Sequence, residues 1–211
     1  MNKFLKKKFG FTLAEILIAM TIIGTIFILS VPVLQNSTNE REKHSQLMKL
    51  YPIMDNMIHL IVLDYIKPEN VPFGEVDEYG NDIFSTKMVE KLRIGEDCQN
   101  TSTSDQGCWA KETFNGINFN TDSSFYKMRL VDGTSLAIKT FKKCNTAQTI
   151  DDKKFDNVCA VIYIDINSFD PPNEWGKDAF CFIYNKQGDF KPASSAARAI
   201  IERPQETKSH S

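Results

Sequence analysis

A single carboxylate, Glu15, interrupts an apolar run that covers residues 11–34. The segment just before this run carries four lysines: Lys3, Lys6, Lys7 and Lys8. A carboxylate inside a membrane-sized apolar segment is costly, so it is by default a functional residue that needs a partner. The chemistry open to Glu15 is an ion pair with a cation in apolar surroundings.

A cut after Gly10 creates such a cation. It exposes an α-amino group on Phe11, one turn of helix before Glu15. Within one helix Glu15 already lies near the N-terminus, where the helix dipole favours an anion. Between neighbouring copies the same amine can reach across to Glu15, so that register and recruitment both depend on one buried ion pair. The pattern therefore predicts ordered assembly of subunits.

The apolar run is long enough to cross a membrane. As a helix with a rise of about 1.5 Å per residue it measures roughly 36 Å, against about 30 Å for a hydrocarbon core. The lysines flank its N-terminal side and a mixed-charge stretch, residues 40–43, follows it. This asymmetry predicts an N-terminus in the cytoplasm and the rest of the chain outside.

Two simpler interpretations of the run compete with this one. A secretory signal peptide has an apolar region of about 7–15 residues and a small-residue cleavage site, and the run here is longer and lacks such a site. A plain single-pass anchor fits the length and the basic flank. It leaves Glu15 unexplained.

The stretch GFTLAEILIAM resembles the N-terminus of type IV prepilins and pseudopilins. The matching residues are Gly10, Phe11, Thr12, Leu13 and Glu15. The resemblance implies that a prepilin peptidase removes the leader, residues 1–10, and methylates the new amino group. Gly10 and Phe11 are then substrate positions, and Glu15 forms the assembly salt bridge with the amine of Phe11.

The resemblance also implies partners and a location. The partners are other pilin subunits, the prepilin peptidase and an inner-membrane assembly platform. The chain is then a single-pass protein of the inner (cytoplasmic) membrane, with its N-terminus in the cytoplasm, that later enters an extracellular pilus or a periplasmic pseudopilus. The leading hypothesis is a structural filament subunit; the alternatives are a minor tip subunit or adhesin, and a plain anchored extracytoplasmic domain.

Composition and motifs narrow the function classes. The formal net charge is −2, without the basic excess that marks a direct nucleic-acid partner. The sequence contains no phosphate loop, no Gly-x-Ser-x-Gly and no paired-histidine motif. We therefore expect neither an enzyme nor a cofactor.

The fold class predicted is α+β, with one long kinked N-terminal helix and an antiparallel sheet of about four strands. Residues 11–34 form the membrane or filament-core half of the helix, and residues 35–66 form its amphipathic half, kinked where proline interrupts it. The second half carries an apolar stripe in steps of three and four: Leu47, Leu50, Met54, Ile58, Ile61 and Tyr65. We expect this stripe to pack on the sheet.

Residues 67–191 are predicted to form one globular domain, followed by a partly disordered tail over residues 192–211 with a short helix from Ala197 to Ile201. A long connection to about residue 111 contains a helix that starts at Ser85 as N-cap and ends at Gly95. Hairpin turns are expected at Asn115-Gly116 and Asp132-Gly133. The runs VCAVIYIDI and DAFCFIYN predict two further strands.

All five cysteines lie in the part predicted to be exported, where disulfides persist. Connectivity cannot be deduced from sequence alone. Short loops favour Cys98 with Cys108 and Cys144 with Cys159, which leaves Cys181 as a buried strand residue. The alternative pairs Cys159 with Cys181, like the C-terminal bridge of many type IVa pilins.

The loop DINSFDPPNEWGKDAF resembles a pattern found near the C-terminal end of many pilin-like proteins, although Ser168 stands where glycine is usual. Its oxygen-bearing side chains Asp165, Asn167 and Asp178 are weak candidates for calcium, as in the loops of major pseudopilins. The EF-hand template fails, because Phe169 occupies a ligand position and Gly176 falls where glutamate is needed. The alternative is a loop whose side chains bond their own backbone.

Overall fold

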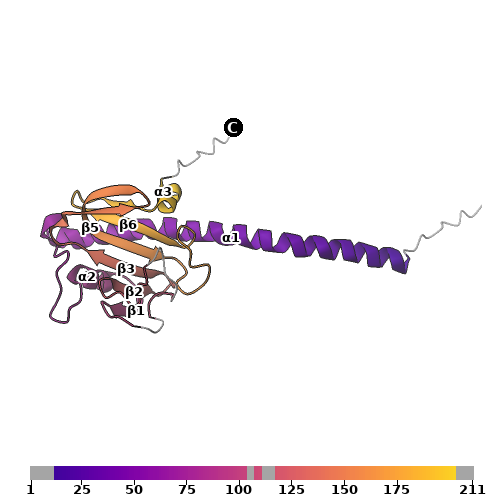
Figure 1. The fold of residues 1–211 in the computed structure, drawn as a ribbon, viewed down its shortest axis with the longest axis horizontal. Coiled ribbons are helices and arrows are strands. Elements are labelled where there is room, and N and C mark those ends of the chain that lie inside the picture. The colour runs from indigo at the N-terminus through magenta and orange to yellow at the C-terminus, as the bar shows by residue number, and fades with distance from the viewer. Residues whose placement is uncertain (1–11, 104–106, 111–116, 203–211) are drawn as a thin grey trace, which may run out of the picture. The chain divides into compact units, whose positions relative to one another are not determined.

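The computed structural model describes residues 12–103, 107–110 and 117–202, and the side chains of residues 27–40 lie outside this description. The chain divides into two compact units, residues 1–42 and residues 43–211. Helix α1 (Leu13–Asp64) contributes residues to both (Figure 1). The predicted α+β class with an N-terminal helix is confirmed.

In the first unit, the α1 side chains over residues 13–26 are exposed and mostly apolar, with Glu15 as the one charged residue among them. The two threonines among them, Thr21 and Thr25, turn their hydroxyls back to carbonyls three or four residues earlier. This local bonding satisfies polar groups inside an apolar helix. Within the described residues, no helix is both long enough and apolar enough to cross a membrane. The span predicted over residues 11–34 lies partly outside those residues.

The second unit is a seven-stranded antiparallel sheet in the order β1-β2-β3-β5-β6-β7, with β4 paired to β5. The strands are β1 (Ile94–Gln99), β2 (Tyr126–Leu130), β3 (Ser135–Thr140), β4 (Thr146–Ile150), β5 (Lys153–Asp165), β6 (Ala179–Asn185) and β7 (Phe190–Pro192). The helices are α2 (Ile83–Lys91), α3 (Ser195–Ile201) and the short 3₁₀ turns η1 (Pro68–Asn70) and η2 (Lys142–Cys144).

The prediction of about four strands was too low. The four expected strands correspond to β2, β3, β5 and β6, which are mostly buried. The additional strands β1 and β4 are largely exposed and polar, and β7 has only three residues. Main-chain pairing with a neighbouring strand holds these three strands in the sheet. They therefore do not need the long alternating apolar pattern by which strands are predicted from sequence.

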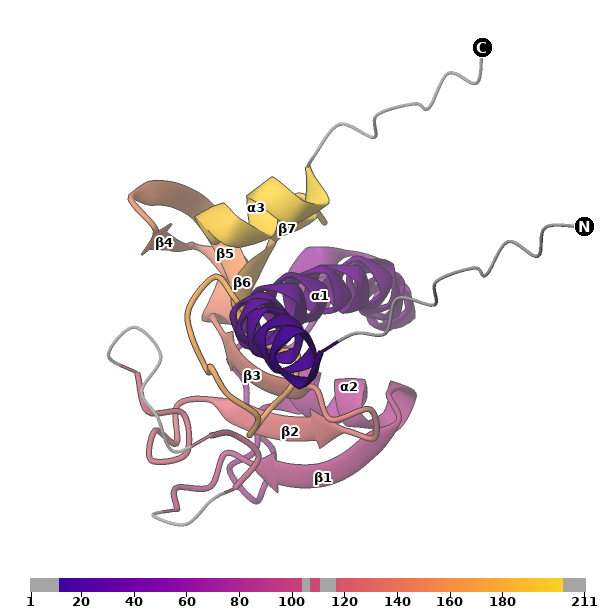
Figure 2. The ribbon, with the colours of Figure 1, turned by 90° about the vertical axis from the view of Figure 1, so that its right-hand side faces the viewer.

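The apolar stripe of α1 forms the centre of the core. Its predicted members Leu47, Leu50, Met54, Ile58 and Ile61 are buried, and Tyr65 packs at the edge. They pack against side chains from one face of the sheet, among them Leu136, Ile162, Phe182 and Phe190. Figure 2 looks along α1 and shows the sheet curving around it, with β1, β2 and α2 on one side and β6, β7 and α3 on the other.

Helix α2 begins earlier than predicted. Its N-cap is Asp82, whose carboxylate accepts hydrogen bonds from the amide and hydroxyl of Ser85, at 2.8 and 2.6 Å. Ser85 is therefore the third residue of the helix and is buried, and Leu92 is its C-cap in place of Gly95. Aspartate and serine are both common N-cap residues, so residue type alone does not separate Asp82 from Ser85.

The turns follow local chemistry. The hairpin predicted at Asp132-Gly133 joins β2 to β3, with Gly133 at a φ of +93° and the Asp132 carboxylate accepting the Thr134 amide at 3.0 Å. The hairpin predicted at Asn115-Gly116 lies outside the described residues. The short C-terminal helix is found as α3, capped by the hydroxyl of Ser194.

The core stripe gives a test of the fold. Replacing Ile58, which is fully buried, by alanine should lower the free energy of unfolding by about 2–5 kcal/mol because it leaves a cavity. Leu60→Ala is the matched control, since Leu60 lies on the same helix but is 54% exposed. Thermal unfolding of the two variants checks this; equal destabilisation would contradict the packing of α1 on the sheet.

Candidate functional site

The first turn of α1 forms a capping box. The amide and the hydroxyl of Thr12 both donate to Glu15 Oε2 at 2.8 Å, and the Glu15 amide donates to Thr12 Oγ1 at 3.3 Å. This reciprocal arrangement satisfies main-chain donors that a helix start leaves unpaired. Glu15 therefore has a partner in its own chain, and Thr12 is the capping residue, which the Thr-x-x-Glu spacing indicates.

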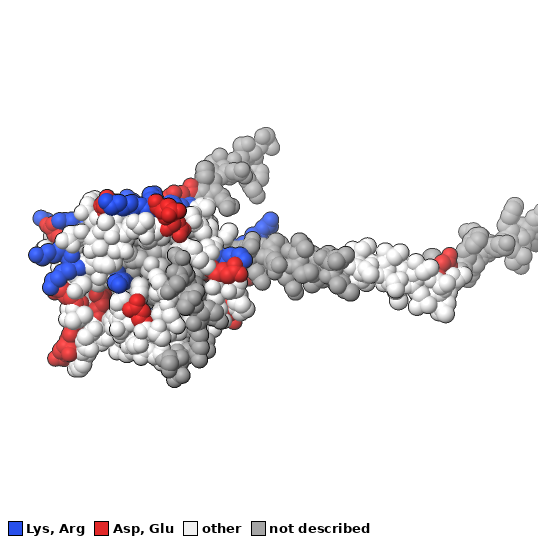
Figure 3. All heavy atoms as spheres, in the orientation of Figure 1, with Lys and Arg blue, Asp and Glu red and all other residues white. Residues whose placement is uncertain are grey.

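The other two residues predicted for this site, Gly10 and Phe11, lie before the described part of the chain. Beyond Glu15, the helix surface over residues 16–26 carries no charge. Figure 3 shows the described start of the chain in white, apart from one red acidic position. An ion pair made by Glu15 in such surroundings would be shielded from water and correspondingly strong.

The loop between β5 and β6 is built around two buried carboxylates. Asp165 Oδ1 accepts the amides of Asn167 and Ser168 at 3.2 and 3.1 Å. Asp178 accepts the amide of Asn173 through Oδ2 at 3.0 Å and that of Glu174 through Oδ1 at 2.7 Å. The two carboxylates thus fold the loop by bonding its backbone.

A lysine of α1 completes this arrangement. Lys43 Nζ lies 3.1 Å from Asp178 Oδ2. Burial, together with the neighbouring charge of Asp178, raises the pKa of Asp165 to about 8, while Lys43 acts in the opposite direction. The contact of Lys43 with the loop was not predicted, because 135 positions separate Lys43 from Asp178.

Most carboxylate oxygens of the predicted calcium ligands accept hydrogen bonds from the protein. Both oxygens of Asp178 and one of Asp165 are already occupied by N–H donors, which repel a cation. The Asn167 side chain donates to the carbonyl of Asp170 at 2.6 Å. Among the described residues, no group of three or more histidine, cysteine, aspartate or glutamate side chains could hold a metal ion.

Comparison with known protein families gives one match. The family model described as the prokaryotic N-terminal methylation motif matches residues 5–31. The chain carries the type IV pilin and pseudopilin signature. Comparison with curated proteins and with solved structures found no significant match. The pilin signature covers the start of the chain, and the globular unit after residue 42 is outside it.

The pilin-like chain has two disulfides in its globular unit. They join Cys98 to Cys108 and Cys144 to Cys159, with Cα–Cα distances of 6.0 and 4.0 Å, and they are the pairs that short loops favour. Cys181 is buried in β6 without a disulfide, so the alternative pairing of Cys159 with Cys181 is not found. The first bridge ties the loop after β1 to the sheet, and the second holds η2 against β5.

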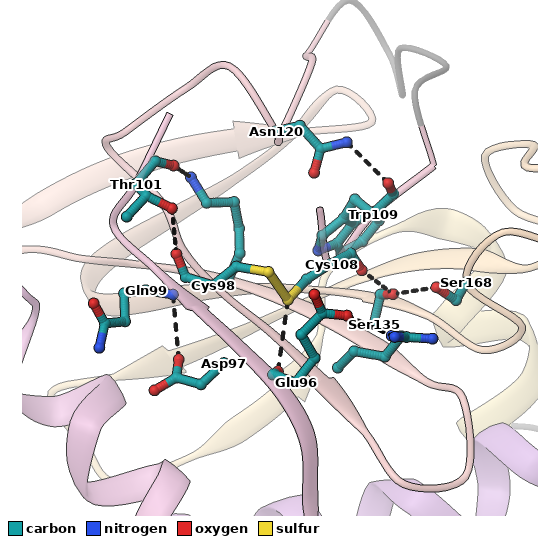
Figure 4. Close-up of a disulfide and its surroundings, with 12 residues drawn as sticks. Glu96, Asp97, Cys98, Gln99, Thr101, Cys108, Trp109, Asn120, Ser135 and Ser168 are labelled. Atoms are coloured by element: carbon teal, nitrogen blue, oxygen red, sulfur yellow. Dashed lines mark hydrogen bonds and ion pairs between the residues drawn. A yellow bond between two sulfur atoms is a disulfide. The ribbon is translucent and has the colours of Figure 1, made fainter. Parts of the chain in front are cut away.

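Side chains around the first disulfide anchor its loop (Figure 4). The Ser135 hydroxyl donates to the carbonyl of Cys108 and lies 2.8 Å from the Ser168 hydroxyl. Lys127 is buried, and its ammonium donates to the carbonyls of Thr101 and Asp122. Burial lowers the pKa of Lys127 to about 8. No local sequence pattern indicates that Lys127 is buried.

Asp165 makes stability depend on pH. Its folded pKa is raised, so between about pH 4 and pH 8 the folded state holds a proton that the unfolded state lacks. The contribution of this group is therefore lost as the pH rises through that window. In the variant Asp165→Asn this loss should disappear, so that the variant gains stability relative to wild type between pH 4 and pH 8. Denaturant unfolding of both proteins across the window measures the difference; parallel curves would contradict it.

Proposed function

We propose that this chain is a structural subunit of a type IV pilus or pseudopilus. It is inserted in the inner membrane through residues 11–34, cut after Gly10, methylated on Phe11 and polymerised through its N-terminal helix. The observation that carries this proposal is the methylation motif over residues 5–31, with Glu15 as the one acid in its apolar helix. The motif indicates a structural protein and not an enzyme.

The exposed apolar surface of α1 supports polymerisation. In the first unit, large exposed side chains include Leu17, Ile18, Met20 and Ile23. Scattered apolar residues are normal on a surface, whereas a continuous apolar helix surface indicates a membrane or a protein partner. A chain first held in a lipid bilayer and then in a filament core has both partners in turn.

The globular unit offers a second apolar surface on the same helix. On the side of α1 away from the sheet, Ile53, Leu60 and Leu63 are exposed. The two apolar surfaces belong to different parts of the chain, so contact between them is heterologous. Heterologous contacts that do not close into a ring generate open helical filaments.

Glu15 can then act as the assembly residue. Before processing its carboxylate is satisfied by Thr12, at 2.8 Å from both the amide and the hydroxyl. After the cut, the new amine of Phe11 is a stronger partner, because a charge-assisted hydrogen bond exceeds a neutral one. Exchange of the capping contacts for a pair with a neighbouring subunit makes cleavage the step that permits growth. The partners required are a prepilin peptidase, an assembly platform and other pilin subunits.

A binding role as a minor tip subunit has one observation in its favour. A cavity of about 210 Å³ opens on the face of the sheet away from α1, lined by Ile117, Phe125, Lys139, Phe141, Gln148, Val161 and Tyr163. Aromatic walls with a few polar groups are typical of ligand sites. Stoichiometry separates the two roles, since a major subunit dominates purified filaments and a tip protein is a trace component.

The proposed function is tested at Glu15. The variant Glu15→Gln should insert into the membrane and be processed normally, whereas its incorporation into filaments should fall at least about tenfold, because the ion pair between subunits is lost. Glu42→Gln, an exposed acid of the same helix, is the matched control and should assemble normally. Quantifying the subunit in membrane and sheared-filament fractions checks this. Wild-type levels of Glu15→Gln in filaments would refute the assembly role.

A further inference from the structure

The ion pair between Lys43 and Asp178 differs from the other ion pairs of the described residues. The Lys43 side chain is 15% exposed and that of Asp178 is 0% exposed. In every other ion pair between described residues, both side chains are at least 33% exposed. Exposed pairs contribute little to stability, whereas removing one partner of a buried pair leaves an uncompensated charge.

The ion pair of Lys43 and Asp178 lies at a loop that contains two buried carboxyl groups. Asp165 and Asp178 are both fully buried, and each interacts unfavourably with the charge of the other. The hydrogen bonds that they accept from loop amides provide dipoles but no full positive charge. Asp165 Oδ2 has no hydrogen-bond partner. The ammonium of Lys43 is the cation that lies against this pair.

We propose that Lys43 supplies the positive charge that a divalent ion would provide in a loop of this type, and that it ties the loop to α1. Asp178 Oδ2 accepts both the Asn173 amide and the Lys43 ammonium, so both of its lone pairs are taken by N–H donors that a calcium ion would have to displace. The loop of residues 165–178 therefore depends on the helix for its order and not on the supply of metal.

Thermal unfolding of the full chain in detergent micelles tests the proposal, with calcium chloride at millimolar concentration or with EDTA. Wild type should unfold at the same temperature in both. Lys43→Met should lower the Tm by about 5–10 °C, because it leaves the buried carboxylate of Asp178 without a cation. Lys91→Met is the matched control: Lys91 pairs with Asp64 at 3.5 Å at an exposed position, so its loss should have little effect.

A double-mutant cycle separates the charge of Lys43 from its packing. If Lys43 is the counter-ion of Asp178, its replacement should be less damaging in the Asp178→Asn background, where the charge that it pairs with is absent. Lys43→Arg, which keeps the charge, should unfold near the wild-type temperature. Three results would overturn the proposal: stabilisation of wild type by calcium, an effect of Lys43→Met no larger than that of Lys91→Met, or the same effect of Lys43→Met in both backgrounds.

Discussion

Helix α1 carries more apolar surface than the sheet of its own chain buries. Between residues 43 and 64, the side that carries Leu47, Met54 and Ile58 is enclosed by the sheet. In the first unit, residues 13–26 are exposed although most of them are apolar. Burial of a single large apolar side chain contributes about 1.5–3 kcal/mol, so this exposed surface provides a large driving force for association with a membrane or with other subunits.

The same helix also organises the polar part of the structure. At its start, Thr12 and Glu15 close the first turn, and further along Lys43 reaches the buried carboxylate of Asp178. Both contacts place an acid where few other charges can compensate it. In the proposed assembly, Glu15 exchanges its partner for an amine of another chain, whereas the cation that pairs with Asp178 belongs to the chain itself.

Local sequence patterns predicted the elements whose apolar residues recur with helical or strand spacing. The stripe from Leu47 to Ile61 has helical spacing, strands β5 and β6 are β-branched and aromatic runs, and Gly133 is at a turn that requires positive φ. Loop length was sufficient to favour the two disulfide pairs. In these cases the information lies within a few residues of the feature.

Other features depend on contacts between distant segments, and the sequence did not show them. Strands β1 and β4 are polar and are defined by the neighbours they pair with. By sequence, Lys127 and Lys43 look like ordinary surface lysines. In the structure, Lys127 donates to the carbonyl of Thr101 and Lys43 pairs with the carboxylate of Asp178, both far away in the sequence. The contact between Thr12 and Glu15 is local and follows the spacing of a capping box, but the ion-pair hypothesis for Glu15 did not include it.

In the proposed function, cleavage after Gly10 converts a membrane-held chain into a filament subunit. The decisive measurement is mass spectrometry of the N-terminus, in cells with and without a prepilin peptidase. We expect a chain that begins at N-methylated Phe11 only when the peptidase is present. A chain that keeps Met1 in both cells, or one that starts beyond Leu34, would contradict it.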